Sequence, residues 1–402
     1  MFLNFKISNY RSIGTELAIN FSILDSQKLG AFAEIKDRAI NNIGCLVGPN
    51  ASGKSNILKG IVHFLRCTHL SYSSPLYRYA GGFPSHFCCK DAPMVFSTEF
   101  IDNEVQYKYE IAILNGIVQK ETLDKRNETT KRYSSIFKRE IGSVLFNKMI
   151  KMNNQDINRL GNDMSLLSLL MELNYFDKNE FSLIKEFHSN VHPEFLYMNQ
   201  YPEGKLHIIS QTLQNDKILL GELIDELKAI DTGISSLEIK HTKRKFRNID
   251  SGEINNEREF STILTNHKVS NKDYLLSMLE ESSGTMHYID TFIHLYKVLQ
   301  NGGLFIADEL EQSLHPDLTA RIINRFMDKD KNPNNAQLLF TTHNPWFLQD
   351  LTKTQIYIIE KNNKAETEVT RLDEIAGVRN DENYFMKYIA GEYDGRPKIK
   401  EA

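Results

Sequence analysis

The 402-residue sequence has few cysteines and no long apolar run. Four cysteines occur, at positions 45, 67, 88 and 89, without a C-x-x-C pair or a spacing suited to a metal site. This pattern predicts free thiols in a reducing cytosol. The N-terminal segment MFLNFKISNYRS lacks the order of a signal peptide, and no run approaches the roughly 20 apolar residues of a membrane helix. We therefore expect a soluble cytoplasmic protein that has no membrane partner.

A strong excess of one charge is also missing, because the net charge is only −4. The chain as a whole should attract neither nucleic acid nor an anionic membrane, so such a partner would need a local patch. One candidate is the basic segment KHTKRKFRN at residues 240–248, which surrounds Phe246. This segment could bind the phosphate backbone of a nucleic acid. The alternative is a solvated hairpin edge that its charges protect from aggregation.

The two ends of the chain carry the strand signals of an α/β fold. Residues 3–7 alternate as a half-buried strand, and the apolar run 43–47 is followed by a glycine loop and then by helical spacing at residues 57–65. Residues 94–101 and 105–113 predict an antiparallel hairpin. In the last third, the runs GLFIAD, QLLFTT and QIYIIE alternate with helical segments, as in a buried parallel sheet.

The middle of the sequence has a different character. From about residue 125 to 231 its apolar residues follow a helical period, with no repeat and no sustained heptads. We therefore expect a nucleotide-binding domain assembled from residues 1–124 and 234–402, with residues 125–233 inserted as a helical arm.

The segment VGPNASGKSN at residues 47–56 matches the phosphate-loop pattern G-x-x-x-x-G-K-[ST]. Backbone N–H groups of such a loop converge on phosphate oxygens; the lysine reaches the β- and γ-phosphates and the serine a Mg²⁺ ion. The alternative is a plain glycine turn. The expected ATP-binding residues are Gly48, Pro49, Asn50, Ala51, Ser52, Gly53, Lys54, Ser55 and Asn56, with Ser55 also a metal ligand.

The apolar run in GLFIADE ends in two acids, Asp308 and Glu309. Asp308 would hold Mg²⁺, and Glu309 would orient and polarise the water that attacks the γ-phosphate. Apolar runs that end in acids are also common at strand ends without any catalytic role.

The run QLLFTTHNP places His343 at the C-terminal end of a third predicted strand, the edge where open α/β sheets bind ligands. There the imidazole could hydrogen-bond the γ-phosphate and sense its presence. The alternative is a structural histidine.

The segment EESSGTMHYIDTF places Ser282, Ser283 and Gly284 at the start of a predicted helix. Free backbone N–H groups and the helix dipole make such a start a second anion site. Helix capping alone would also explain the two serines.

These four elements, in this order, resemble the heads of ABC-type ATPases. The resemblance covers roughly residues 1–115 and 235–400. It implies ATP and Mg²⁺ as cofactors and a homodimer or higher homo-oligomer, in which Ser282 and Gly284 of one head contact the γ-phosphate held by the other. ATP would then bind between two heads and stabilise their dimer.

The finer match is to the RecF/SMC-like branch, and within it to ATPases of the OLD (overcoming lysogenization defect) and abortive-infection defence type. It rests on GPNASGKSN, ESSGT, ADELEQSLHP, FTTHNP and YIAGEYDGRPKI. The resemblance implies that His315 and Pro316 lie near the dimer interface and that Arg11, in NYRS, lies near the nucleotide. It also implies an antiphage role in which the ATPase serves a separate nuclease or toxin.

The sequence departs from this group in three respects. No glutamine occurs between Asn56 and Val105, so the Q-loop of ABC heads cannot be placed. The signature reads Ser-Ser-Gly-Thr rather than Ser-Gly-Gly-Gln, from which we expect slow hydrolysis. We also expect this chain to lack the C-terminal Toprim nuclease that many OLD relatives carry. Two alternatives stay open: a DNA-repair or chromosome-maintenance ATPase that clamps DNA directly, and a scaffold that binds ATP without turnover.

Overall fold

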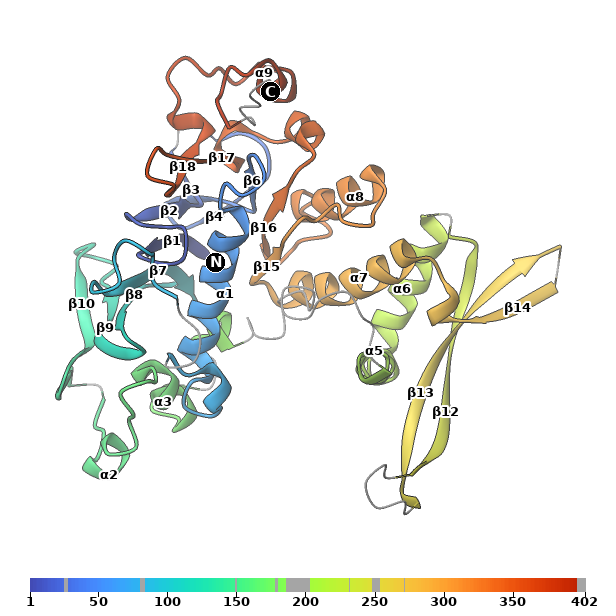
Figure 1. Cartoon of the computed structure of the whole chain (residues 1–402), viewed down its shortest axis with the longest axis horizontal. Coiled ribbons are helices and arrows are strands. Elements are labelled where there is room, and N and C mark those ends of the chain that lie inside the picture. Colours follow the sequence, from blue (N-terminus) through green and yellow to red (C-terminus); the bar gives the residue numbers. More distant parts are fainter. Residues whose placement is uncertain are drawn as a thin grey trace. The chain divides into compact units, whose positions relative to one another are not determined.

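The computed structural model describes residues 1–24, 28–79, 84–148, 150–177, 180–185, 203–230, 232–247, 254–270 and 272–395 (Figure 1). The chain divides into two units. The first comprises Met1–Val191, Val298–Leu310 and Ala320–Ala402. The second comprises His192–Lys297 and Glu311–Thr319.

A five-stranded sheet forms the core of the described part of the first unit. Its order is β15 (Leu304–Ala307), β16 (Gln337–Thr342), β6 (Ile43–Val47), β17 (Ile356–Lys361) and β18 (Thr367–Arg371). The first four strands are parallel, and β18 pairs antiparallel with β17. Every residue of β15, β16 and β6 is buried, as expected for strands covered on both faces. The predicted buried parallel sheet is confirmed.

The helix α1 (Lys54–Leu70) begins directly after the glycine loop and fills the space beside this sheet (Figure 1). Its apolar residues recur at helical spacing, so one side of the helix is buried. Phe64 stacks on Phe96 and Tyr109, with ring centroids 5.6 and 5.7 Å apart. These two rings belong to a second sheet, so α1 joins the two sheets.

This second sheet is antiparallel and has seven strands within the described residues. Its order is β11 (Ser143–Phe146), β10 (Tyr133–Glu140), β9 (Ile117–Arg126), β8 (Val105–Leu114), β7 (Met94–Asp102), β1 (Phe2–Ser8) and β2 (Leu17–Asn20). The β7–β8 hairpin closes on the pair Asp102 and Val105, which confirms the predicted hairpin.

The prediction that the chain turns helical from residue 125 is wrong for residues 125–146, which end β9 and form β10 and β11. The register of β10 against β9 shifts between Ser135 and Phe137. This irregularity leaves Ile136 and Phe137 both buried, although they are neighbours in sequence. The alternation of apolar and polar residues that indicates a strand in a sequence is therefore interrupted at these two residues.

A buried carboxylate ties the short helix α3 (Leu166–Glu172) to the antiparallel sheet. Glu121 is fully buried and accepts hydrogen bonds from the Tyr109 hydroxyl at 2.9 Å and from the backbone N–H of Leu166 at 2.8 Å. Arg139 pairs with the same carboxylate at 3.4 Å. The negative charge thus lies at the positive end of a helix and beside a cation.

The remaining elements of the first unit are short. A small sheet contains β3 (Ser22–Ile23), β5 (Arg38–Asn41) and β4 (Phe32–Ile35). The short helices are η2 (Pro75–Tyr77), α2 (Asn154–Ile157), η6 (Pro345–Asp350), η7 (Lys353–Gln355), η8 (Leu372–Glu374) and α9 (Tyr384–Ala390). All four cysteines are free, as predicted. None of the described helices combines the length and apolar character that a membrane crossing requires.

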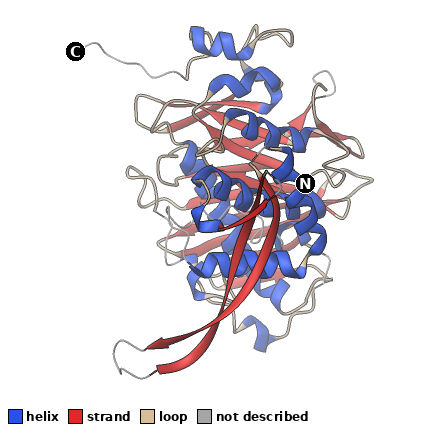
Figure 2. Cartoon of the chain, turned by 90° about the vertical axis from the view of Figure 1, so that its right-hand side faces the viewer, coloured by secondary structure: helices blue, strands red, loops and turns tan. Residues whose placement is uncertain are grey.

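The second unit contains two helices and a long ribbon. The helices α5 (Glu203–Asn215) and α6 (Lys217–Ala229) confirm the helical pattern of that segment. The strands β12 (Ile234–Arg247), β13 (Ile254–Val269) and β14 (Lys272–Ser277) form an antiparallel sheet, and β12 and β13 make the long ribbon in Figure 2. The chain then passes through η5 (Met278–Glu280) into α7 (Ser283–Asn301). Both α7 and α8 (Pro316–Met327) have residues in both units.

The basic segment of residues 240–248 lies largely in β12. The backbone register sets Lys243 opposite Glu259 and Lys245 opposite Glu257. Lys240 is exposed. The side chains of the other basic residues lie outside the described part of the structure.

Candidate functional site

The loop between β6 and α1 is shaped by two glycines. A Cβ atom on Gly48 would lie 2.0 Å from the carbonyl oxygen of Ile359, and one on Gly53 would lie 2.0 Å from the Thr367 hydroxyl. Gly53 also has a φ of +110°, a conformation that side chains rarely adopt. The phosphate-loop pattern requires glycine at both of these positions. The structure adds that they are required by the neighbouring hairpin β17–β18.

Two features of the loop suit a negatively charged ligand. The hydroxyl of Ser52 is buried and has no hydrogen-bond partner among the described residues. No side chain caps the N-terminus of α1, and its first turn contains no acid. An unmatched buried hydroxyl and an uncapped helix start are groups that a phosphate can satisfy.

Lys54 is buried and its ammonium group turns back over its own loop. Its Nζ donates to the carbonyl oxygens of Gly48 at 2.8 Å and Pro49 at 3.0 Å. The same Nζ lies 3.5 Å from Nδ1 of His343. The predicted phosphate lysine is therefore held next to the predicted switch histidine, although 289 residues separate them in the chain.

Asp308 and Ser55 meet at the predicted metal position. The Ser55 hydroxyl donates to Oδ1 of Asp308 at 3.1 Å, and the Thr341 hydroxyl donates to the same oxygen at 2.6 Å. Thr341 also accepts a bond from the backbone N–H of Glu309 at 2.7 Å. A hydroxyl and a carboxylate are oxygen donors that Mg²⁺ accepts, with phosphate and water completing its shell. These residues fit a Mg²⁺ ion that accompanies a nucleotide.

Glu309 and His343 also meet, at 3.2 Å between Oε1 and Nε2. The side chain of Glu309 is 46% exposed and that of His343 is 37% exposed, so solvent reaches both. Glu309 has a φ of +49°, an uncommon conformation for a residue with a side chain. Both residues line a cavity of about 680 Å³ together with Lys361 and residues 50–56.

The predicted signature residues lie in the second unit, whereas the loop, Asp308, Glu309 and His343 lie in the first. Ser282 caps α7, because its hydroxyl accepts a hydrogen bond from the N–H of Thr285 at 3.0 Å. Ser283 is exposed. A Cβ on Gly284 would lie 2.7 Å from the carbonyl oxygen of Ser313, so glycine permits this close packing. The capping interpretation of Ser282 is thereby confirmed.

The remaining residues named from the resemblance have local partners. His315 lies 3.4 Å from the Asp317 carboxylate, and both side chains are largely exposed. Arg11 donates from Nε to the Tyr10 hydroxyl at 3.0 Å. Its neighbour Ser12 accepts a hydrogen bond from Asn56 at 2.8 Å, so the NYRS segment supports the start of α1.

Sequence reasoning missed three residues of this site: Thr341, Lys361 and Thr367. Lys361 carried a usable signal, because it ends the parallel strand β17 just as Val47 ends β6. Carboxyl ends of parallel strands share one edge of a sheet, where ligands bind. Thr341 and Thr367 carried no such signal, since threonine is common in strands.

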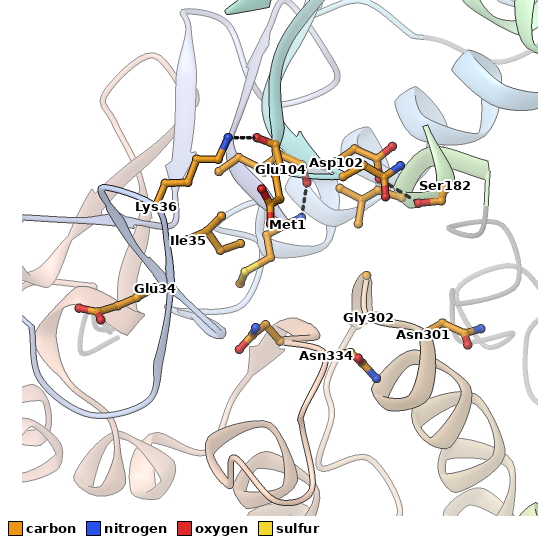
Figure 3. Close-up of a pocket in the computed structure, with 15 residues that line it drawn as sticks. Met1, Glu34, Ile35, Lys36, Asp102, Glu104, Ser182, Asn301, Gly302 and Asn334 are labelled. Carbon is orange, nitrogen blue, oxygen red and sulfur yellow. Dashed lines mark hydrogen bonds between the residues drawn. The ribbon is translucent and has the colours of Figure 1, made fainter. Parts of the chain in front are cut away.

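A second cavity, of about 400 Å³, lies at the amino ends of β15 and β16, which is the edge of the core sheet opposite the glycine loop (Figure 3). Lys36 donates to the Glu104 carbonyl oxygen at 2.7 Å, and Ser182 donates to Asp102 at 2.8 Å. Burial lowers the pKa of the Met1 amine to about 5. None of the predicted site residues lines this cavity.

The geometry defines a class of protein. A glycine loop follows the central strand of a mostly parallel sheet, and an acid pair and a histidine follow the next two strands at the same edge. With the antiparallel sheet, this is the fold of an ABC-type P-loop ATPase head.

A family model described as "AAA domain, putative AbiEii toxin, Type IV TA system" matches residues 43–348. The match spans more than half of the sequence, and the chain belongs to this family. None of the curated proteins compared with the chain matches it.

Three solved structures of SMC heads are similar over most of the chain. An SMC head bound to the C-terminal winged-helix domain of ScpA has 11% identity and a TM-score of 0.47, and the match covers 92% of this chain and 96% of that one. The SMC head of Thermotoga maritima has 13% identity, a TM-score of 0.40 and coverages of 92% and 98%. An SMC head with an extended coiled coil, bound to the C-terminal domain of ScpA from Pyrococcus furiosus, has 10% identity, a TM-score of 0.43 and coverages of 92% and 95%.

Proposed function

We propose that the chain binds ATP with Mg²⁺ in the cavity at the glycine loop and hydrolyses it slowly. One observation carries the proposal: Lys54, Asp308 and Glu309 converge through Ser55, Thr341 and His343 at one edge of three adjacent strands. A phosphate-binding cation, a metal-binding carboxylate and a water-activating carboxylate are the groups that phosphoryl transfer to water needs.

The contacts of these side chains suggest how each group would act on a bound nucleotide. Lys54 would exchange its bonds with the carbonyl oxygens of Gly48 and Pro49 for bonds to the β- and γ-phosphates. Ser55 and Asp308 would hold Mg²⁺. Glu309 would orient the attacking water, and His343, beside Lys54 and Glu309, would donate a hydrogen bond to the γ-phosphate.

We further propose that two heads close around ATP, with Ser282, Ser283 and Gly284 of one copy facing the γ-phosphate bound to the other. The support is the start of α7, which offers exposed serines on a capped helix. ATP would shift the open and closed populations by its differential affinity for the two states. The helices α5 and α6 would then pass this change to a separate nuclease or toxin in antiphage defence. The toxin in the family description is compatible with that setting.

Two variants test the enzymatic part of the proposal. Lys54→Ala should abolish nucleotide binding in a calorimetric titration, whereas Lys59→Ala, on the same helix, should bind as the wild type does. Glu309→Gln should keep binding, lose phosphate release and sediment as a dimer when ATP is present. Normal ATP hydrolysis by Glu309→Gln would show that Glu309 does not activate the water.

A second candidate is direct clamping of DNA, as in chromosome-maintenance ATPases. The observation in its favour is the basic segment on the long β12 strand, where Lys240 is exposed. This function predicts ATP-dependent DNA binding that weakens steeply with salt. Co-purification of the chain with a toxin-like protein, and no such DNA binding, would favour the defence function.

A further inference from the structure

The hairpin β17–β18 forms one wall of the glycine loop. β17 pairs in parallel with β6 up to Ile358 and Val47. Beyond this pair β6 ends but β17 continues, and the carbonyl oxygen of Ile359 fills the space beside Gly48. The next residues of β17 therefore run alongside the start of the loop, and its last residue is Lys361.

The second strand of the hairpin holds the other end of the loop. Thr367 lies opposite Lys361 in the register of β17 and β18. Its hydroxyl donates to the carbonyl oxygen of Ser52 at 2.9 Å and lies against Gly53. The backbone N–H of Thr367 donates to the Ser12 carbonyl oxygen at 2.7 Å. The position of Lys361 is therefore fixed relative to the loop by bonds on its paired strand.

Lys361 brings an exposed positive charge to the wall of the cavity. The other lysine there, Lys54, is buried and donates to loop carbonyl oxygens. Two lysines, one at the start of α1 and one at the end of β17, thus face one cavity built on a phosphate loop. Two cations around one cavity favour a ligand that carries several negative charges.

The strand order gives the two sides of the cavity different roles. β15 and β16, which carry Glu309 and His343 at their ends, lie on one side of β6, and β17 lies on the other side. If Glu309 and His343 surround the γ-phosphate, then Lys361 approaches the nucleotide from the opposite flank.

We propose that Lys361 is a nucleotide-binding residue that contacts the inner phosphates, which ATP and ADP share. The assignment rests on the proposed function, because it presupposes a nucleotide in this cavity. A contact that is equal in the ground state and the transition state strengthens binding without changing the chemical step. Loss of the Lys361 charge should therefore raise the Kd and KM and leave kcat unchanged.

The experiment uses the full chain and two probes, ADP and a non-hydrolysable ATP analogue, each with Mg²⁺, in calorimetric titrations. Lys361→Met keeps the length of the side chain and removes its charge. Lys364→Met, in the turn of the same hairpin, is the matched control. Because Lys361 is an exposed charge that would contact phosphate, Lys361→Met should lower the affinity for both probes equally, by about five- to tenfold at low salt. Lys361→Arg should restore most of the affinity, and the control should match the wild type.

Three results would contradict the assignment, and they can be told apart. Unchanged affinity of Lys361→Met for both probes would show that Lys361 does not bind the nucleotide. A loss confined to the ATP analogue would place the contact on the γ-phosphate and overturn the inner-phosphate assignment. If the wild type binds neither probe, the proposed function itself fails, and the wild-type titration alone reveals this. Steady-state kinetics add one more check, because a fall in kcat with an unchanged KM would also contradict the proposal.

Discussion

His343 joins Glu309 to Lys54: its Nε2 lies 3.2 Å from the Glu309 carboxylate, and its Nδ1 lies 3.5 Å from Lys54 Nζ. A lysine ammonium group can only donate, so Nδ1 is the acceptor in a hydrogen bond between these two atoms. On its other side the ring contacts Glu309, and it thus holds the proposed water-activating carboxylate near the phosphate loop.

Removal of this imidazole should slow turnover more than it weakens binding. His343→Ala removes the group that holds Glu309 and that would donate to the γ-phosphate. We expect kcat to fall about a hundredfold to a thousandfold, the scale for loss of one preorganised donor. Phosphate release measured over a range of ATP concentrations separates kcat from KM. An unchanged kcat would leave His343 with a purely structural role.

Ala51 should be a source of strain in the phosphate loop. It has a φ of +62°, where a side chain costs about 1–2 kcal/mol relative to glycine. Ala51→Gly should therefore stabilise the protein by about 0.5–1 kcal/mol, after the extra freedom of glycine in the unfolded chain is subtracted. Urea unfolding measures the change. As a control, Ala320→Gly, inside helix α8, should destabilise by about 1 kcal/mol. A lower urea midpoint for Ala51→Gly would contradict the strain argument.

Ser282 should have two separable roles, as a helix cap and as a phosphate contact. Aspartate and asparagine both cap helices as serine does. Ser282→Asp, however, would set a negative charge against the γ-phosphate across the proposed dimer. In the Glu309→Gln background, Ser282→Asn should still sediment as a dimer with ATP, and Ser282→Asp should not. Equal assembly of both variants would argue against the phosphate contact.

His63 should make the fold sensitive to acid. Burial lowers its pKa to about 4 from an ordinary value of 6.5, and the positive charges of Arg11, Arg66 and Lys59 act in the same direction. The Tyr10 hydroxyl accepts from Arg11 at 3.0 Å and lies 3.2 Å from Nδ1 of His63, within hydrogen-bond distance.

The imidazole of His63 binds a proton more weakly in the folded state than in the unfolded chain. The free energy of unfolding should therefore decrease as the pH falls from 6.5 towards 4. Between pH 7 and pH 5 the loss should be about 1 kcal/mol, which allows for the partial exposure of the ring. Urea midpoints at the two pH values, compared for the wild type and His63→Gln, measure it. The same slope in both proteins would assign the acid sensitivity to other groups.

The sequence predicted those parts of the site that one short segment encodes. The apolar run 43–47, the glycine pattern and the helical spacing after it follow one another along the chain, so local preferences suffice for the strand, loop and helix. The positions of Asp308 and His343 at the sheet edge were predicted in the same way, because each directly follows a buried strand of the parallel sheet. The bulged strand β10 was missed, since its two adjacent buried residues do not alternate.

What the sequence determined by itself is the chemistry: a lysine loop, an acid pair, a histidine and a serine-capped helix, each recognisable from its neighbours in the chain. Only the tertiary structure decided which of these meet and what supports them. Thr341 links Asp308 to Glu309, and Thr367 holds a loop 315 residues away. Such contacts depend on strand order and register, which are settled by burying the whole sheet and leave no local pattern in the sequence.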